Sequence, residues 1–483
     1  MTIFDTNKNL EVIQKIAKKK RVSLFLVGGY LRDYVLGRDN IDFDFAVSKN
    51  ALKLAEEVAK SIKGVYVLLD EEHGCARVVR KEKGVIYTFD FANFRAPTIQ
   101  GDLRHRDFTI NTLAIDMSKV KHDSTWDSLL KIGKKASEDL SKKKVRMTRA
   151  SVFKEDPLRL LRGFSMSATL GFKIDEATKE CIKENAPLLK SVASERIGVE
   201  WFKILTSPRA YKTLVLMDRL GVLEQIIPQV RIMFGCTQGK YHHLNVWKHS
   251  LEAVNQFEKI CEEVKEDDKV NAYFDAEIVS GRSRRSIIKM AVLLHDIGKP
   301  DTRKKRPEGG YSFYSHEHVG KRITHHIARQ LKVSTKERRM LEDMVQFHLR
   351  PGYISNYRRP SAKMIYRYMR DTKDEAVSVA LLSLADQRAT RGPLTSESDQ
   401  VHHEDICRML VEQFFVKREE KPLTCFITGR DLIKSLKLKP SKLFSVILKE
   451  VEEQQVLGKI TSKKEALSLA KDIKKQETNR ADK

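Results

Sequence analysis

The feature that most limits how this chain can fold is a change of hydrophobic pattern near Ser151. Before that residue, short apolar runs separated by turns occur at 23–27, 43–47, 66–69 and 85–91. Such runs predict strands, and residues 51–62 carry a helical pattern between two of them. Beyond Ser151 the apolar spacing is helical almost everywhere. The sequence therefore predicts an α+β fold, with a mixed sheet and helices in front and an all-α part behind.

Charge narrows the class of partner. The 483 residues carry 90 Lys and Arg against 65 Asp and Glu, a formal net charge of +25. An excess of this sign raises the local concentration of polyanions, nucleic acid first and acidic membrane second, although it also aids solubility. The most charged stretch, residues 262–285, lacks a strong period and is predicted to be a surface loop or insertion.

Several classes of protein are excluded early. No apolar run approaches the roughly 20 residues of a membrane span, and residues 1–20 lack the apolar core of a signal peptide. The six cysteines are scattered and form no CxxC pair, which disfavours a disulfide framework or a cysteine zinc site. We therefore expect a cytoplasmic protein with reduced thiols and no membrane partner. The oligomeric state is not determined by the sequence.

A first group of candidate functional residues follows the apolar run that ends at Val27. Gly28 and Gly29 come directly after it, and two glycines there would let the backbone approach a phosphate closely. Arg32 follows and can offer a guanidinium fork to phosphate oxygens. The order of apolar run, glycine pair and arginine therefore predicts a nucleotide-binding turn.

Two carboxylates follow in the next strand-like run. Asp42 and Asp44 are two residues apart, so they share one face of a strand while Phe43 and Phe45 face the core. Mg²⁺ in proteins is held by a few carboxylates together with substrate phosphates. A pair of metals can activate a 3′-hydroxyl and stabilise leaving pyrophosphate. Asp42 and Asp44 are thus predicted to be catalytic Mg²⁺ ligands.

These residues resemble the class II tRNA nucleotidyltransferases and bacterial poly(A) polymerases, which belong to the polymerase β-like superfamily. The stretch 102–111 is similar to the family's second motif, with His105 in place of its first arginine. The resemblance implies a nucleotidyltransferase head and a nucleotide site that includes Arg106, Asp107 and Asn111. A weaker third block, Gly133 with 139–140 and Arg146, resembles the family's head-to-neck connector.

A fourth block spans 155–162, where Pro157 suits the first turn of a helix. Asp156, Arg159 and Arg162 recur every three residues on one helix face, so they could form an ordinary ion pair or read a base edge. The resemblance implies that Asp156 and Arg159 read C and A, with Arg162 also at the nucleotide. A third arginine of the family falls at Ser165. Residues 194–200 resemble the family's neck helix.

The second half of the chain carries a pattern of histidines and aspartates that is typical of a metal site. His295 and Asp296 end an apolar run, and Asp386 ends another. Buried polar groups need partners, and together with His249 these residues could satisfy one another through a divalent transition metal. The order resembles the HD phosphohydrolase superfamily, which implies an all-α HD domain and two further possible ligands, His316 and His348.

The resemblance implies four parts: a catalytic head at 1–147, a helical neck and body at 148–235, an HD domain at 236–400 and a helical tail at 401–483. It implies addition of CCA to the 3′ end of tRNA, with ATP and CTP as donors. The short segment 96–101 favours addition of CC alone as an alternative. Further alternatives are a poly(A) polymerase, an HD-type phosphohydrolase and a noncatalytic RNA-binding protein.

Overall fold

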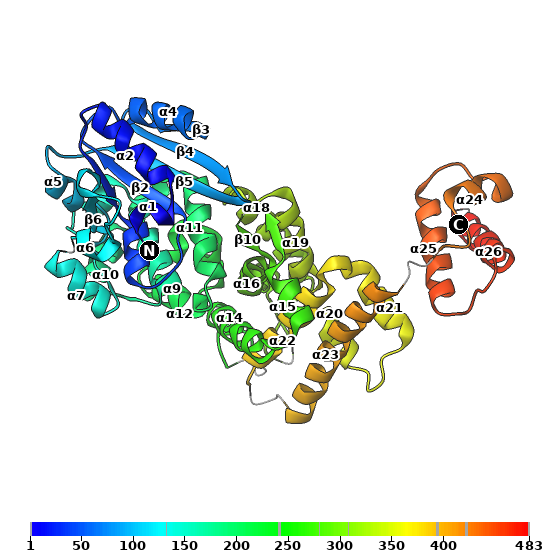
Figure 1. The fold of residues 1–483 in the computed structure, drawn as a ribbon. Helices are drawn as coiled ribbons and strands as arrows, with labels where there is room; N and C mark the ends of the chain where they lie inside the picture. The colour runs from blue at the N-terminus through cyan, green and yellow to red at the C-terminus, as the bar shows by residue number, and fades with distance from the viewer. Residues whose placement is uncertain are drawn as a thin grey trace. The chain divides into compact units, whose positions relative to one another are not determined.

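The computed structural model describes residues 2–481 except 132, 240–242, 280, 308, 393–395 and 421–423. The chain divides into two compact units, residues 1–228 and 229–483. In Figure 1 the first unit is coloured from blue to green and the second from green to red. The finer division into head, neck, HD domain and tail stays a prediction. None of the helices in the described chain combines the length and apolar character that a membrane span needs.

The first unit is built on a mixed sheet with the strand order β3-β4-β5-β2-β1-β6. Its strands are β1 (Leu24–Val27), β2 (Asp42–Val47), β3 (Val65–Asp70), β4 (Cys75–Glu82), β5 (Val85–Asn93) and β6 (Ala114–Asp116). Strands β2 and β5 pair in parallel, whereas the other neighbours are antiparallel. Each of the predicted apolar runs lies in one of these strands, and the predicted α+β class is confirmed. Strand β4 was not predicted.

The pleat of β2 and β5 separates apolar from acidic side chains. Phe43 stacks on Phe89 with ring centroids 5.4 Å apart, and Phe45 stacks on Phe91 at 5.0 Å. All four rings are buried. Because side chains alternate along a strand, the residues between these phenylalanines project from the opposite face of the sheet. Asp42 and Asp44 are therefore held on that opposite face.

Helices surround the sheet and extend beyond it. They are α1 (Ile3–Thr6), α2 (Asn9–Lys19), α3 (Gly29–Val35), α4 (Ala51–Ser61), α5 (Ile99–Arg104), α6 (Trp126–Leu129), α7 (Lys134–Ser141), α8 (Val152–Glu155), α9 (Leu158–Leu170), α10 (Glu176–Asn185), α11 (Ser194–Thr206), α12 (Ala210–Arg219) and α13 (Leu223–Ile226). Short 3-10 helices lie at η1 (Thr109–Asn111), η2 (Met117–Lys119), η3 (Ala186–Ser191) and η4 (Pro228–Met233), and β7 (Lys144–Val145) pairs with β8 (Lys173–Ile174). Helix α9 packs against α11.

The second unit is almost entirely helical. Its helices are α14 (Val246–Glu263), α15 (Asp268–Asp275), α16 (Arg284–Leu294), α17 (Lys299–Thr302), α18 (His316–Gln330), α19 (Thr335–Phe347), α20 (Arg350–Ser355), α21 (Ala362–Thr372), η5 (Lys373–Glu375), α22 (Ala376–Ala389), α23 (Glu397–Glu419), α24 (Gly429–Leu436), α25 (Lys442–Val456) and α26 (Lys463–Ala481). Two small hairpins join β9 (Glu277–Val279) to β10 (Arg282–Ser283) and β11 (Lys304–Lys305) to β12 (Tyr311–Ser312).

The prediction of a loop over 262–285 is wrong. This stretch contains α15 and the hairpin β9–β10. Val270, Tyr273 and Phe274 are buried, and their spacing of three and four residues defines one face of α15. The high charge of the stretch lies on the other positions and hides this apolar face. The burial of three large side chains therefore decides the local structure.

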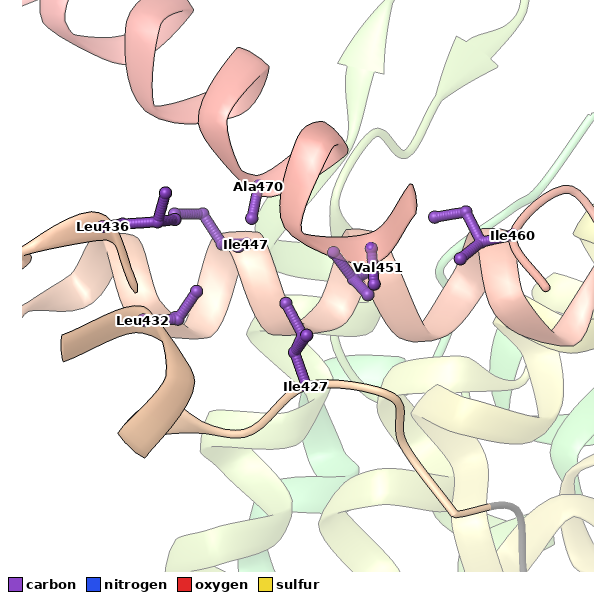
Figure 2. Close-up of a cluster of buried hydrophobic side chains, with 8 residues drawn as sticks. Ile427, Leu432, Leu436, Ile447, Val451, Ile460 and Ala470 are labelled. Atoms are coloured by element: carbon purple, nitrogen blue, oxygen red, sulfur yellow. The ribbon is translucent and has the colours of Figure 1, made fainter. Parts of the chain in front are cut away.

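The tail helices have a core of their own. Side chains of α24, α25, α26 and their flanking segments bury one another in a cluster that consists of Ile427, Leu432, Leu436, Ile447, Val451, Ile460, Ala466 and Ala470. Figure 2 shows these side chains converging from the three helices, with Ile447 and Val451 projecting from the long helix α25. Most of the stability of a protein helix comes from tertiary packing of its apolar face. The cluster supplies that packing.

This core yields a test with a matched control on the same helix. We expect Ile447→Ala to lower the stability of the tail by about 2–5 kcal/mol, because it removes a fully buried side chain. Val446→Ala alters an exposed neighbour and should change the stability of the tail by about 0.5 kcal/mol or less. Hydrogen exchange over residues 427–473 measures the loss of protection in each variant. Equal protection in the two variants would contradict the described core.

Candidate active site and metal centre

A cavity of about 390 Å³ lies in the first unit beside β2, β5 and α9. It brings together nine of the residues predicted for catalysis and nucleotide binding: Gly28, Gly29, Arg32, Asp42, Asp44, Arg106, Asp107, Asn111 and Arg162. A second cavity of about 140 Å³ contains the other two, Asp156 and Arg159. Because Arg106, Asp107 and Arg162 line both cavities, the two spaces are neighbours.

Three carboxylates meet at the first cavity. Asp44 lies opposite Asp90 in the parallel register of β2 and β5, and Asp42 is two residues before it. Burial raises the pKa of Asp44; Arg106 opposes this effect, and the neighbouring Asp90 and Asp42 add to it. A cation that binds nearby stabilises the ionised form of a buried carboxylate among other carboxylates. The three carboxylates therefore fit a divalent metal. This agrees with the prediction that Asp42 and Asp44 are metal ligands.

Asp90 was not predicted from the sequence. Arg77 holds it with two hydrogen bonds, from Nε to Oδ1 at 2.7 Å and from Nη2 to Oδ2 at 2.8 Å. The signal that could have found Asp90 is its place between Phe89 and Phe91, which repeats the alternation of apolar and acidic residues around Asp44. That signal becomes specific only when the parallel pairing of the two strands is known.

The glycine pair brings backbone close to the carboxylates. Gly28 has a φ of +83°, a conformation that favours glycine. A Cβ atom there would lie 3.0 Å from Nη1 of Arg106 and 3.1 Å from Oδ2 of Asp44. Any side chain at this position would therefore enter the space between the Arg106 guanidinium and the Asp44 carboxylate. Helix α3 begins at the next residue.

Arg32 is fixed by the protein itself. Its Nε and Nη2 donate to the carboxylate of Asp33 at 2.8 and 2.9 Å, and its Nη1 donates to Oδ1 of Asn111 at 2.9 Å. Asn40 donates to the same Asp33 carboxylate at 2.7 Å. The guanidinium thus links α3 to η1 in the cavity wall. Its contact with phosphate stays a prediction.

Asp107 is a buried acid that is paired with groups of α9 and η1. Burial alone would raise its pKa, but the guanidinium of Arg162 and the amide of Asn111 outweigh burial and hold the pKa below its usual value. Arg162 Nη2 lies 2.9 Å from Oδ2 of Asp107, and Asn111 Nδ2 donates to Oδ1 at 2.9 Å. The ionised Asp107 therefore positions Arg162 and Asn111 at the wall of the first cavity.

The second cavity combines a carboxylate with guanidinium groups. Asp156 accepts a hydrogen bond from the backbone N–H of Leu158 at 3.2 Å and one from Arg196 at 2.9 Å. Arg159 is buried and donates to the carbonyl of Val152 at 3.3 Å. Arg95 also lines this cavity and was not predicted. An acceptor and a donor side by side can pair with a base edge.

In the second unit the six predicted HD residues form two adjacent groups. In the first, His249 Nε2 lies 2.9 Å and His295 Nε2 lies 3.5 Å from Oδ1 of Asp386. In the second, Oδ1 of Asp296 lies 3.3 Å from His316 Nε2 and 3.8 Å from His348 Nε2. The ligand atoms within each group lie within 4.8 Å of one another.

Backbone carbonyls orient these imidazoles. Nδ1 of His295, His316 and His348 lies 2.7, 2.8 and 2.7 Å from the carbonyl oxygen three residues earlier in the chain. A carbonyl only accepts, so each Nδ1 carries hydrogen and each Nε2 is directed at the carboxylates. The Nε2 atoms of His316 and His348 face each other at 3.3 Å. Two facing lone pairs suit a shared cation.

The electrostatics of the cluster also favour a cation. Burial would lower the pKa of His295, but Asp296 and Asp386 outweigh it and raise the pKa to about 10. Burial and the neighbouring His316 lower the pKa of His348 to about 3, which keeps that imidazole in its metal-binding neutral form. The buried Asp296, the partly exposed Asp386 and four buried imidazoles therefore fit one or more divalent transition metals.

Family models match most of the chain. The poly A polymerase head domain matches residues 24–146, the RNA and SrmB-binding site of polymerase A 171–233, the HD domain 246–391, and tRNA nucleotidyltransferase domain 2 residues 322–470. The A-adding tRNA nucleotidyltransferase of Deinococcus radiodurans is 28% identical over 91% of this chain and 93% of its own length. The CC-adding enzyme of Thermus thermophilus is 28% identical over 92% of each chain.

The chain is similar over about nine tenths of its length to tRNA nucleotidyltransferases, and it matches the poly A polymerase head and HD domain models. The predicted family and the predicted enzyme class, a nucleotidyltransferase, are confirmed. Solved structures share the fold of this nucleotidyltransferase: the Thermotoga maritima CCA-adding enzyme complexed with tRNA has a TM-score of 0.61 at 20% identity, covering 97% of this chain and 94% of its own. A CCA-adding enzyme with ATP has a TM-score of 0.63 at 20% identity, covering 96% and 93%.

The metal centre of this nucleotidyltransferase can be tested with two histidines on α18. We expect His316→Ala to weaken binding of a divalent transition metal by about tenfold or more, because it removes a ligand that faces Asp296. His318→Ala alters a side chain that is 61% exposed, outside the cluster, and should bind like the wild type. Metal titration calorimetry measures both.

Thermal unfolding gives an independent reading of the same site. Metal at about 100 times its Kd should stabilise the wild-type unit by about 2.7 kcal/mol, and a chelator should reverse the effect. Wild-type metal affinity in His316→Ala would show that His316 is not a ligand.

Proposed function

We propose that this nucleotidyltransferase adds CCA to the 3′ end of tRNA, with CTP and ATP as donors. The observation that carries the proposal is the pairing of a carboxylate-lined cavity with a smaller cavity that holds a carboxylate and guanidinium groups. The first suits nucleotidyl transfer and the second suits a choice among bases. The relatives that align over most of the chain are named as tRNA nucleotidyltransferases, which supports tRNA as the acceptor.

The roles of the residues follow from their positions. Asp42 and Asp44, with Asp90 beside them, would hold divalent cations, for which we propose Mg²⁺. When bound, such cations promote loss of the proton from the attacking hydroxyl and neutralise charge on the leaving group. Gly28 leaves room for the phosphates. The RNA 3′-oxygen then forms a bond to the α-phosphorus, the bond from that phosphorus to the β-phosphate bridging oxygen breaks, and pyrophosphate leaves.

Base choice follows from hydrogen-bond chemistry. Cytosine presents an amino donor at N4 beside an acceptor at N3, and adenine presents an amino donor at N6 beside an acceptor at N1. Asp156 can accept from the amino group while Arg159 donates to the ring nitrogen. Uracil and guanine present the reverse order, a carbonyl acceptor beside an N–H donor. The pair therefore accepts C and A and rejects U and G.

Addition of part of the CCA sequence is a second candidate. The segment 96–101 is short, and its second half already forms the start of α5, where Ile99 and Leu103 pack against Val27, Ala46 and Ala114. This packing leaves little chain beside the nucleotide cavities that could rearrange between C and A. The A-adding and CC-adding names of the Deinococcus and Thermus relatives also favour a partial product.

The HD cluster supports a further activity in the same chain. Its carboxylates and imidazoles suit metal-dependent hydrolysis of a phosphoester, because metal-bound water is a strong nucleophile near neutral pH.

We propose that the protein is located in the cytoplasm, since all six cysteines are free and a reducing compartment keeps cysteines in the thiol form. A poly(A) polymerase would not need a cavity that accepts both C and A.

The test of the product uses tRNA transcripts that end at the discriminator base or after CC, each with CTP, ATP or both. Full CCA on the first substrate would support the lead proposal. CC without A, or A only after CC, would replace it by partial addition. Long A tracts would indicate a poly(A) polymerase, and no incorporation would contradict nucleotidyl transfer to tRNA.

Catalysis can be tested on neighbouring aspartates. We expect Asp42→Asn and Asp44→Asn each to lower incorporation by at least about a thousandfold, because each removes a proposed metal ligand from the reacting centre. Asp39→Asn alters an exposed aspartate that does not line the cavity, and it should keep full activity. Near-normal incorporation by Asp42→Asn would contradict the assignment of the carboxylates.

A further inference from the structure

We infer that Lys203 of α11 binds a phosphate group of the substrate in the 390 Å³ cavity, in addition to pairing with Glu200. The inference deepens the proposed nucleotidyl transfer and rests on it. Lys203 and Glu200 both line the cavity that contains Asp42 and Asp44. Neither of them belongs to the residues predicted for the site.

The position of Lys203 follows from helix packing. Helix α11 packs against α9, which supplies Arg162, Ser165, Met166 and Thr169 to the same cavity. The Lys203 side chain is 53% exposed, so its ammonium lies at an accessible part of the cavity wall. Its Nζ lies 2.8 Å from Oε1 of Glu200. An ammonium carries three donors, so two remain for a ligand.

Two other cations of the cavity are held more rigidly. Arg32 is fixed by Asp33 and Asn111, and Arg77 by a two-point contact with Asp90. Arg162 lies 2.9 Å from Asp107, whereas Arg106 lies 3.6 Å from Asp102. The fixed guanidinium groups of Arg32 and Arg77 shape the wall. Lys203 instead combines a compact charge with a flexible four-carbon stem, which can follow a phosphate as it enters.

The surroundings of Glu200 explain why a cation is needed here. Glu200 is only 6% exposed, and the Ser165 hydroxyl contacts its other oxygen. A buried carboxylate in the wall would repel a triphosphate or an RNA phosphate. Lys203 neutralises this charge, and in addition its ammonium can contact a phosphate oxygen directly. These are two separable roles, neutralisation of Glu200 and direct binding.

The experiment separates the two roles with a double-mutant cycle. Lys203→Met, Glu200→Gln and the double variant are compared with the wild type in steady-state incorporation, with KM measured separately for CTP, ATP and tRNA. If Lys203 binds phosphate, Lys203→Met raises one KM by about tenfold or more, and the double variant keeps most of that increase. A raised KM for nucleotides identifies the triphosphate, and a raised KM for tRNA identifies the RNA phosphate.

Two further variants complete the design. Lys203→Arg keeps the positive charge for both Glu200 and a phosphate, so it should recover most of the affinity that Lys203→Met loses. Lys212→Met alters an exposed lysine of α12 that does not line the cavity, and it should match the wild type. Thermal unfolding checks that each variant is folded. Wild-type KM values in the double variant would overturn the inference, because Lys203 would then only neutralise Glu200.

Failure of the proposed function gives a different result. If the wild type adds no nucleotide to any tRNA, the proposed function fails whatever Lys203 does. Equilibrium binding of CTP with Mg²⁺, and separately of a tRNA transcript, to the same variants then tests Lys203 alone. Unchanged Kd values for both CTP and tRNA in Lys203→Met and in the double variant would overturn the inference, and a Kd for either ligand raised by about tenfold in both variants would support it.

Discussion

The active site depends on the parallel pairing of β2 with β5. Stacked phenylalanines on one face of the two strands, Phe43 on Phe89 and Phe45 on Phe91, fix the register. A shift by one residue would bury the aspartates and expose the rings, so the hydrophobic effect itself holds the carboxylates in place. The same register sets Asp44 beside Asp90 and thereby creates the field that draws a cation to the cavity.

A second principle governs the HD cluster, where helix ends supply the ligands. His295 and His348 lie at the C-caps of α16 and α19, and His316 opens α18. Side chains at such positions can reach both a backbone carbonyl and the centre of the cluster. The carbonyl contacts fix which nitrogen faces the carboxylates, so the backbone three residues before each histidine orients its ring before any metal binds.

Much of the head could be predicted because its chemistry is local in sequence. Gly28, Asp42 and Asp44 lie within 17 residues of one another in the printed sequence, and strand alternation alone places both aspartates on one face. The prediction that Asp156 shares a helix face with Arg159 and Arg162 is wrong, because Asp156 lies in extended backbone before α9 and accepts a hydrogen bond from Leu158 at the start of that helix. The error over 262–285 shows the limit of composition, because a charged surface conceals the apolar face of α15.

The sequence by itself determined the family resemblance, the α+β class and the motif residues, because periodicity and short motifs act within one or two elements. Only the tertiary structure decided which residues from distant parts of the chain join the motif residues at the cavity. Asp90, Arg77 and Lys203 belong to no local motif, and they reach the cavity through strand pairing and the packing of α11 on α9. The physical reason is that contacts between distant segments depend on register and packing, which no short stretch of sequence specifies.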